Sequence, residues 1–99
     1  MSFVTAAPEA LIAAAGDLTG IGSGLTTQNA VVAARTTGVV PAAADEVSVL
    51  TAAQFATHAQ MYQAVGAQAV AVHETFVNTL AASAGSYATT EAANAVAAS

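Results

Sequence analysis

Apolar side chains recur every seven residues through the first third of the chain, at Leu11, Leu18, Leu25 and Val32. Ile21 fills one of the companion positions of the same repeat. Seven-residue spacing sustained over several turns is typical of a helix packed lengthwise on other helices. This feature restricts the chain to helical packing and predicts an interface along one side of the first helix.

The ends of this first helix are marked by residues with known end preferences. Pro8 suits the first helical position, and the carboxylate of Glu9 complements the positive end of the helix dipole. Arg35 suits the last turn, and Gly38, soon followed by a proline, stops the helix. We therefore expect a helix over about residues 8–37.

A second helix is predicted over about residues 45–84. Asp45 and Glu46 lie at its start, where acidic side chains are favourable, and Gly85 follows its end. Its main apolar face is read from side chains at steps of three or four residues. The positions on that face are Phe55, His58, Tyr62, Val65, Ala69, Val72, Phe76 and Leu80.

The connection between the two helices, residues 36–44, is short, so the helices should fold back as an antiparallel hairpin. We expect one domain over residues 1–85. Residues 86–99 are predicted to form a flexible tail, because no hydrophobic face continues through their Ala, Ser, Thr and Asn side chains. Two helices cover only part of each other's apolar face, so the rest needs another cover or remains an interaction surface.

Composition favours a partner protein over a self-sufficient core. Of the 99 residues 56% are hydrophobic, but about three in ten are Ala, and there are only three Phe, two Tyr and no Trp. Ala buries little area, so a small chain with few large side chains is marginally stable alone. The net charge of −5, with Arg35 as the one Lys or Arg residue, argues against nucleic-acid binding.

No catalytic, cofactor or metal site is predicted. With no Cys, thiolate ligands are excluded; His58 has no ligand-type neighbour at helical spacing, and His73-Glu74 lacks the second His of a zinc-protease helix. No serine lies in the Gly-x-Ser-x-Gly pattern of a nucleophile elbow. The glycines at positions 16, 20, 22 and 24 are expected to allow close approach of a neighbouring helix.

Several short motifs resemble those of the mycobacterial PE proteins, in the same order and over essentially the whole chain. They are Pro8-Glu9, Thr36-Thr37-Gly38-Val39-Val40-Pro41, Ala44-Asp45-Glu46-Val47-Ser48, Phe76-Val77-Asn78-Thr79-Leu80 and Ser86-Tyr87-Ala88-Thr89-Thr90-Glu91. The resemblance implies a helical hairpin that pairs with a PPE protein as an elongated four-helix bundle. It further implies export of the pair by a type VII secretion system, with an EspG-type chaperone holding the PPE subunit beforehand.

The resemblance also assigns a role to two residues near the end of the chain. The export motif of the family is Tyr, three residues, then Asp or Glu, which Tyr87 and Glu91 match. On a helix the two side chains, four residues apart, share one face. Because the chain ends at Ser99, it is similar to the short members of the family. A secreted or cell-surface protein is therefore expected, with possible residence in the outer cell envelope.

Two other functions stay open from the residues themselves. The apolar, weakly charged faces could associate with the outer envelope membrane and contribute to small-molecule permeability. Alternatively, two copies of the chain could form a self-sufficient homodimeric bundle. The small apolar area of each helix pair favours a different protein as the partner.

Overall fold

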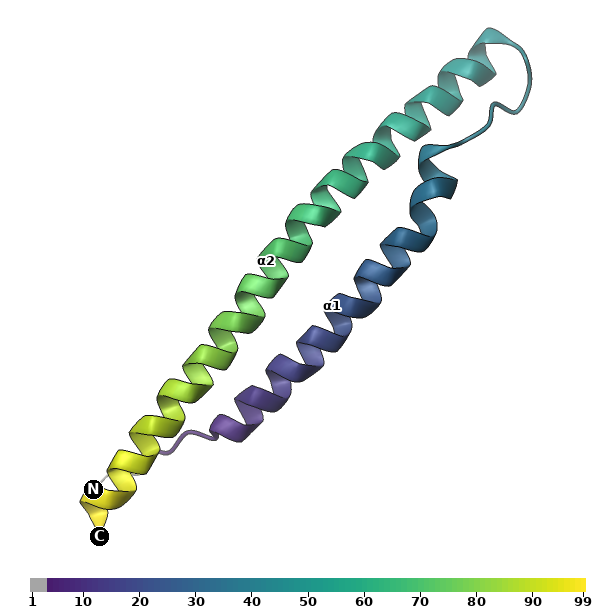
Figure 1. The fold of residues 1–99 in the computed structure, drawn as a ribbon. Helices are drawn as coiled ribbons and strands as arrows, with labels where there is room; N and C mark the ends of the chain where they lie inside the picture. Colours follow the sequence, from purple (N-terminus) through teal and green to yellow (C-terminus); the bar gives the residue numbers. More distant parts are fainter. Residues whose placement is uncertain (1–3) are drawn as a thin grey trace. The chain divides into compact units, whose positions relative to one another are not determined.

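The computed structural model describes residues 4–99, which form two helices: α1 over Pro8–Thr37 and α2 over Glu46–Ala98 (Figure 1). Residues 4–99 contain no β-strand. The predicted all-α, two-helix architecture is confirmed. Residues 1–3, which the predicted domain includes, lie outside the described residues.

Helix α1 begins and ends where its end signals predict. The backbone N–H groups of Ala10 and Leu11 donate to the carbonyl of Ala7 at 3.0 and 3.4 Å, which opens the first turn around Pro8. At the other end, the N–H of Gly38 donates to the carbonyl of Ala34 at 3.1 Å. These end contacts are local, which is why sequence alone locates them.

Helix α2 is capped at its start by Asp45. Oδ2 of Asp45 accepts from the backbone N–H of Ser48 at 2.9 Å, and Oδ1 accepts from Oγ of Ser48 at 2.7 Å. Such a cap satisfies a backbone donor that has no partner within the helix. The hydrogen bonds from the Ser48 side chain and backbone lower the pKa of Asp45 below its usual value.

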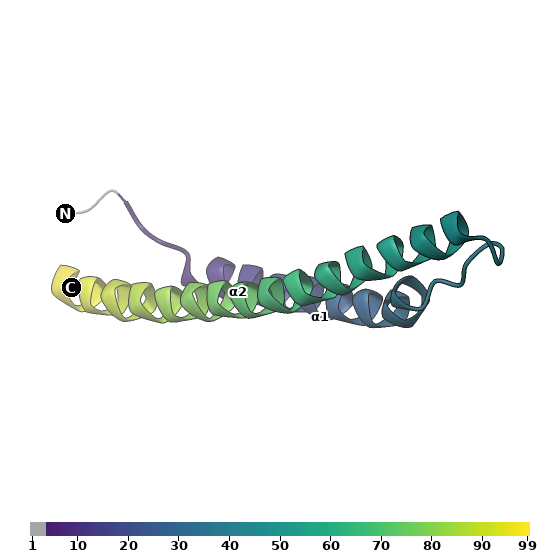
Figure 2. The same ribbon diagram turned by 90° about the horizontal axis from the view of Figure 1, so that it is seen from above.

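The far end of α2 differs from the prediction. The helix passes through Gly85 and continues to Ala98, so residues 86–98 are helical (Figure 2). Glycine costs about 1 kcal/mol relative to Ala inside a helix, and the many Ala residues on both sides of Gly85 favour helix strongly enough to offset it. Gly85 does not adopt a positive φ, so it does not form a helix-ending turn.

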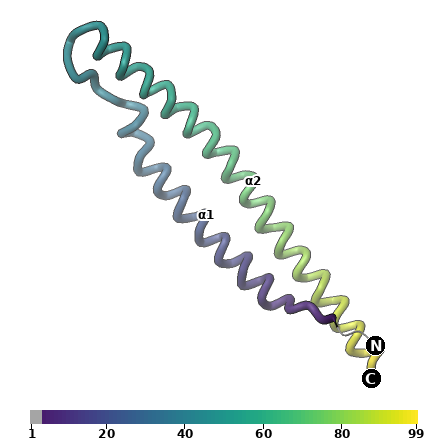
Figure 3. Tube along the Cα trace, turned by 180° about the vertical axis from the view of Figure 1, so that it is seen from behind, coloured from purple at the N-terminus to yellow at the C-terminus, as the bar shows by residue number. Residues whose placement is uncertain are grey.

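The chain divides into two compact units. The terminal unit comprises Met1–Gly22 and His73–Ser99, and the loop unit comprises Ser23–Val72. Within each unit, a segment of α1 lies beside a segment of α2 and runs in the opposite direction (Figures 1 and 3).

The line of contact between the two helix segments of each unit, called the seam here, is built mainly from small side chains. The buried residues among residues 4–99 are Pro8, Ala15, Ala52 and Ala84. Half-buried seam residues of the terminal unit are Leu11, Leu18, Gly22, His73, Val77, Leu80 and Ser83. In the loop unit they are Asn29, Ala33, Thr37, Ser48, Ala56, Ala59, Gln63, Gly66 and Val70.

The seven-residue repeat of α1 does not stay on the seam. Leu11 and Leu18 are half-buried in the terminal unit, whereas Leu25 and Val32 of the loop unit are exposed. A strict seven-residue repeat drifts by about 20° per heptad around a straight helix. The repeat therefore moves off the contact line, and smaller residues such as Ala33 take its place.

Candidate functional site

Many large apolar side chains of the loop unit face outward, and several of them lie beside the seam. Six of them, 37–70% exposed, define what we call the apolar flank: Leu25 and Val32 of α1, and Phe55, Tyr62, Val65 and Val72 of α2. All six belong to the predicted helix and partner interface. They were expected to pack between helices, and within the loop unit they do not.

The flank residues of both helices lie on one side of the loop unit. On α1, Val32 precedes the seam residue Ala33; on α2, Phe55 precedes the seam residue Ala56. One residue corresponds to a rotation of about 100° around a helix. In two antiparallel helices that face each other, the same rotation from the seam brings both side chains to the same side of the pair. The two stripes therefore form one surface.

The other side of the loop unit is chemically different. Positions that directly follow seam residues carry small or polar side chains, except for Val49 near the start of α2. These positions are Ala30, Ala34, Ala53, Thr57, Gln60, Ala64, Ala67 and Ala71. Next to the seam, large apolar side chains are thus concentrated on the flank side, whereas Val31, Leu50 and Met61 are exposed elsewhere on the loop unit.

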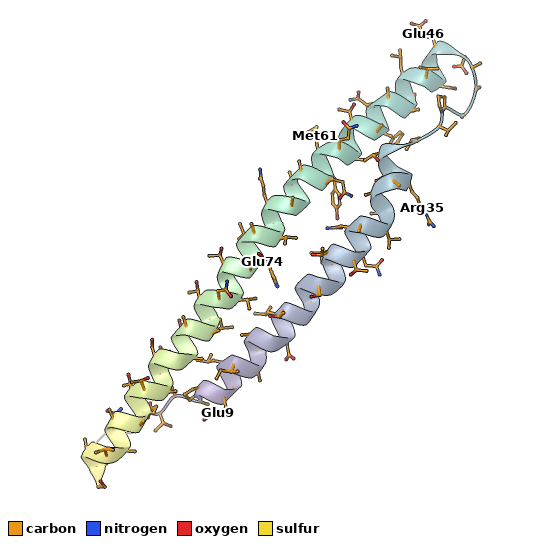
Figure 4. All side chains as sticks on the ribbon, in the orientation of Figure 1. Glu9, Arg35, Glu46, Met61 and Glu74 are labelled. Atoms are coloured by element: carbon orange, nitrogen blue, oxygen red, sulfur yellow. The ribbon has the colours of Figure 1, made fainter. Side chains whose placement is uncertain are left out.

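Charged side chains are absent from the flank side of the loop unit. The positions on this side, including Gln28, Thr51 and His58, contain no Asp, Glu, Lys or Arg. Arg35 points away from α2 in the loop unit, and Met61 points away from α1 (Figure 4). The flank suits a neutral, apolar surface better than a charged one.

Hydrogen bonds between α1 and α2 orient the ring of Tyr62, which lies at the centre of the flank. Oη of Tyr62 donates to Oδ1 of Asn29 at 2.9 Å, and Nε2 of Gln63 donates to the backbone carbonyl of Asn29 at 3.3 Å. Both bonds join α1 to α2 within the loop unit. The aromatic ring of Tyr62 is therefore oriented while 54% of the residue remains exposed.

The predicted interface residues of the terminal unit fall into two groups. Leu11, Leu18 and Leu80 are half-buried on the seam. Ile21 and Phe76 are 63% and 54% exposed, and each precedes a seam residue, as the flank residues of the loop unit do. Contact of any of these side chains with a partner protein stays a prediction.

His73 holds the terminal unit together, a role that periodicity did not reveal. Its Nε2 lies 2.6 Å from the backbone carbonyl of Leu18, and because a carbonyl oxygen only accepts, Nε2 carries the proton. The imidazole ring packs against Gly22, where an added Cβ would lie 2.7 Å from Cδ2 of His73. The spacing in the sequence could have placed His73 on the helix contact, because His73 precedes the seam residue Leu80 by seven positions.

The four glycines of α1 at positions 16, 20, 22 and 24 differ in their surroundings. Gly22 does admit a close neighbour, the His73 ring. Around Gly16, Gly20 and Gly24, by contrast, an added Cβ would meet nothing within 4 Å. No helix of the described chain approaches these three glycines closely, because they point away from the seam.

The two residues of the predicted export motif lie on α2 in the terminal unit. Tyr87 is 50% exposed. Glu91 is half-buried, and its Oε1 accepts from the backbone N–H of Ala6 at 3.1 Å. Residues at the two ends of the chain are therefore in direct contact.

The register of the terminal unit also relates Tyr87 to the Pro8-Glu9 pair. Gly22 lies opposite His73. Two steps of seven residues, back along α1 and forward along α2, lead from this pair to Pro8 and Tyr87. Two motifs that are separate in the sequence thus belong to the same end of the terminal unit.

The described part of the chain shows no arrangement for metal chemistry or membrane crossing. Over residues 4–99, no group of three or more His, Asp or Glu side chains could hold a metal ion. Neither of the described helices combines the length and the apolar character that a membrane span requires.

Comparisons with known proteins bear on the family. The model of the PE family matches residues 4–94. The chain is 65% identical over 99 residues to PE family protein PE13 of Mycobacterium tuberculosis, with 100% of both chains covered. It is 60% identical over 95 residues to PE-PGRS family protein PE_PGRS33 of the same species, covering 96% of this chain and 19% of that protein.

A further relative is PE family protein PE8 of Mycobacterium tuberculosis, 52% identical over 98 residues, which are 99% of this chain and 36% of that protein. The names of these three relatives identify a family and name no reaction. The family model spans most of the chain, and the match to PE13 runs from end to end. The resemblance seen in the sequence motifs is confirmed, and the chain belongs to the PE family.

Proposed function

We propose that this PE protein is a non-catalytic interaction protein that pairs with a PPE-family protein and is exported with it by a type VII secretion system. The observation that carries the proposal is the apolar flank, a one-sided, charge-free surface made by both helices of the loop unit. A helix pair with a matching apolar side would complete a four-helix bundle on this surface. Membership of the PE family supports the identity of the partner.

Burial of the flank would contribute favourably to such pairing. Complete burial of a Val, Leu or Phe side chain contributes about 1.5–3 kcal/mol. The six flank residues are already partly covered, so each would add about 1 kcal/mol, or several kcal/mol in total. Covering Ile21 and Phe76 in the terminal unit would add to this sum.

The remaining roles follow from the same proposal. The PPE subunit, held by an EspG-type chaperone before export, delivers the pair to the secretion machinery. Tyr87 and Glu91 act as the export signal, for which exposure of half the tyrosine leaves a surface to read. The protein then resides outside the cell or at its surface, within reach of the outer envelope.

Pairing is tested by producing the chain alone and together with a candidate PPE-family protein. The expected result is a 1:1 complex that is more helical and melts more sharply than the lone chain. A lone chain that is monomeric, fully helical and cooperative in melting would contradict the need for a partner. A stable homodimer of the lone chain would instead favour the self-sufficient bundle.

Export is tested with Tyr87→Ala, which should abolish secretion and leave pairing intact. Tyr87→Phe is the matched control, because it keeps the aromatic ring and removes only the hydroxyl group. Normal secretion of Tyr87→Ala would remove Tyr87 from the signal.

A role in envelope permeability is the second function to separate. It requires the flank to insert into lipid, since neither described helix meets the requirements for crossing a membrane. Dye release from liposomes treated with the purified pair measures this activity. Liposomes that stay intact would weigh against the permeability function and leave the pairing proposal unchanged.

A further inference from the structure

The contact between Ala6 and Glu91 joins residues that are 85 positions apart. Ala6 belongs to residues 4–7, which precede α1 and are neither helical nor extended in a strand. Glu91 is half-buried, whereas residues 85–90 and 92–98 of the same helix are exposed. The coverage of Glu91 is therefore local, and the hydrogen bond identifies the segment before α1 as the part of the chain that reaches it.

The register of the terminal unit explains why this contact can form. Pro8, the first residue of α1, is at the level of Tyr87, so the turns of α2 beyond Tyr87 have no part of α1 beside them. Residues 4–7 continue from α1 toward this end of α2. The bond from the Ala6 N–H to Oε1 of Glu91, at 3.1 Å, lies one helical turn beyond Tyr87.

We propose that residues 4–7 are a second part of the export signal, in which the Ala6 N–H positions the Glu91 carboxylate for recognition. This inference rests on the proposed function, in which Tyr87 and Glu91 are read by the secretion machinery. The surface that is read then consists of Tyr87, Glu91 and the segment before α1. Glu91 contacts the receptor, and Ala6 acts through Glu91 as a positioning residue.

The chemistry of the carboxylate is compatible with both contacts. An ionised carboxylate has about four acceptor sites, and the Ala6 N–H occupies one of them. The others remain for an Arg, Lys or N–H donor of the receptor. A Glu side chain has many rotamers, so a hydrogen bond that holds one of them reduces the freedom lost when the receptor binds.

The test uses proline to remove a single donor. Ala6→Pro deletes the N–H that Glu91 accepts and leaves Tyr87 and Glu91 intact. Thr5→Pro is the matched control, because it adds the same ring one residue earlier, at a backbone N–H for which no hydrogen bond to residues 4–99 is found. Secretion of the complex with the PPE-family protein should fall about tenfold for Ala6→Pro, because the loss of one hydrogen bond to a charged group weakens binding by about that factor. For Thr5→Pro, secretion should stay near the native level.

Secretion of Ala6→Pro equal to that of the native protein would overturn the inference. Increased secretion would also overturn it, since the segment would then mask Glu91. Helical content and pairing of both variants are measured in parallel by circular dichroism and gel filtration. They should match the native protein, because residues 4–7 lie outside both helices.

A second measurement does not depend on secretion. In the purified complex, hydrogen exchange of the Ala6 amide reports the bond directly. Glu91→Ala should accelerate this exchange, whereas Glu91→Gln, which keeps an acceptor oxygen, should preserve protection. An Ala6 amide that exchanges equally fast in the native protein and in Glu91→Ala would show that the contact does not persist, and the inference would fail.

Tyr87→Ala separates the two proposals. If this variant is not secreted while Ala6→Pro is secreted normally, only the role of residues 4–7 fails. If Tyr87→Ala is secreted normally, the export function of the motif fails, and the inference built on it fails as well.

Discussion

Oη of Tyr62 lies 2.9 Å from Oδ1 of Asn29, so a polar residue of one helix holds the central aromatic ring of the apolar flank on the other. Polar contacts between packed helices are well suited to fix the relative register of the helices. In the loop unit, the bond also fixes how the ring is offered to a partner.

Removing the Tyr62 hydroxyl should lower stability only slightly. Tyr62→Phe keeps the ring and loses the bond to Asn29, and we expect a cost of about 0.5 kcal/mol because the bond is solvent-accessible. Thermal unfolding followed by circular dichroism measures it, with Tyr87→Phe as control. In a double-mutant cycle with Asn29→Ala, the two costs should not add; simple additivity would show that the bond contributes nothing.

Two neighbouring glycines of α1 should respond differently to Ala. Gly20→Ala gains helix propensity and meets nothing within 4 Å, so it should stabilise the protein by up to about 1 kcal/mol. Gly22→Ala places its Cβ 2.7 Å from the His73 ring. The ring must then move and give up its bond to Leu18, which offsets the gain by about 1 kcal/mol.

Chemical unfolding of both glycine variants tests this difference. Combining Gly22→Ala with His73→Ala should remove the clash, so that the Gly22→Ala step becomes as favourable as Gly20→Ala. Equal effects of Gly20→Ala and Gly22→Ala in the native background would contradict the packing of His73 on Gly22.

Substitutions on the two sides of the loop unit should have different effects on pairing. Phe55→Gln and Val65→Gln reduce the apolar flank, and each should weaken binding to a PPE-family protein about tenfold, the equivalent of about 1.4 kcal/mol. Ala53→Gln and Ala64→Gln are matched controls on the other side and should leave affinity unchanged. Calorimetry or gel filtration measures binding; equal losses on both sides would contradict the one-sided interface.

The cap of α2 should make helix stability depend on pH. The hydrogen bonds from Ser48 lower the pKa of Asp45 below its usual value, so the ionised cap stabilises the fold above the pKa of the unfolded chain. This stabilisation declines as the pH falls below the unfolded value and through the folded pKa. In Asp45→Asn, which keeps a capping oxygen, the thermal midpoint should vary less between about pH 5 and about pH 2.

Ser48→Ala provides the control for this pH effect. It removes the side-chain hydrogen bond that is the largest cause of the lowered pKa. The folded pKa of Asp45 then lies closer to its unfolded value, so the decline in stability of this variant should be smaller and should end at a higher pH than in the native protein. An unchanged pH profile in both variants would show that Asp45 does not couple protonation to folding.

The sequence predicted well those features that depend on local chemistry. Pro8, Arg35 and Gly38 mark the ends of α1 through contacts with near neighbours, and both bounds agree with the structure. The end of α2 was missed because Gly85 was read as a stop. The helix propensity of the Ala-rich residues around it outweighs one glycine.

The side of α2 that contacts α1 could not be read from hydrophobicity. Phe55 and Tyr62 mark the most apolar stripe, yet Ala56 and Gln63, one position later, lie on the seam. Periodicity locates an apolar face without stating which neighbour covers it. Likewise, the contact of Ala6 with Glu91 depends on the register of two helices, which no short segment specifies.

The small side chains of the seam also determine when conformational entropy is lost. Ala52, Ala56, Ala59 and Gly66 have no side-chain rotamers to restrict, so forming the helix pair of the loop unit orders the backbone and few side chains. Phe55, Val65 and Val72 keep much of their rotamer freedom until another surface covers them. Most of the side-chain ordering is thereby transferred from folding to association.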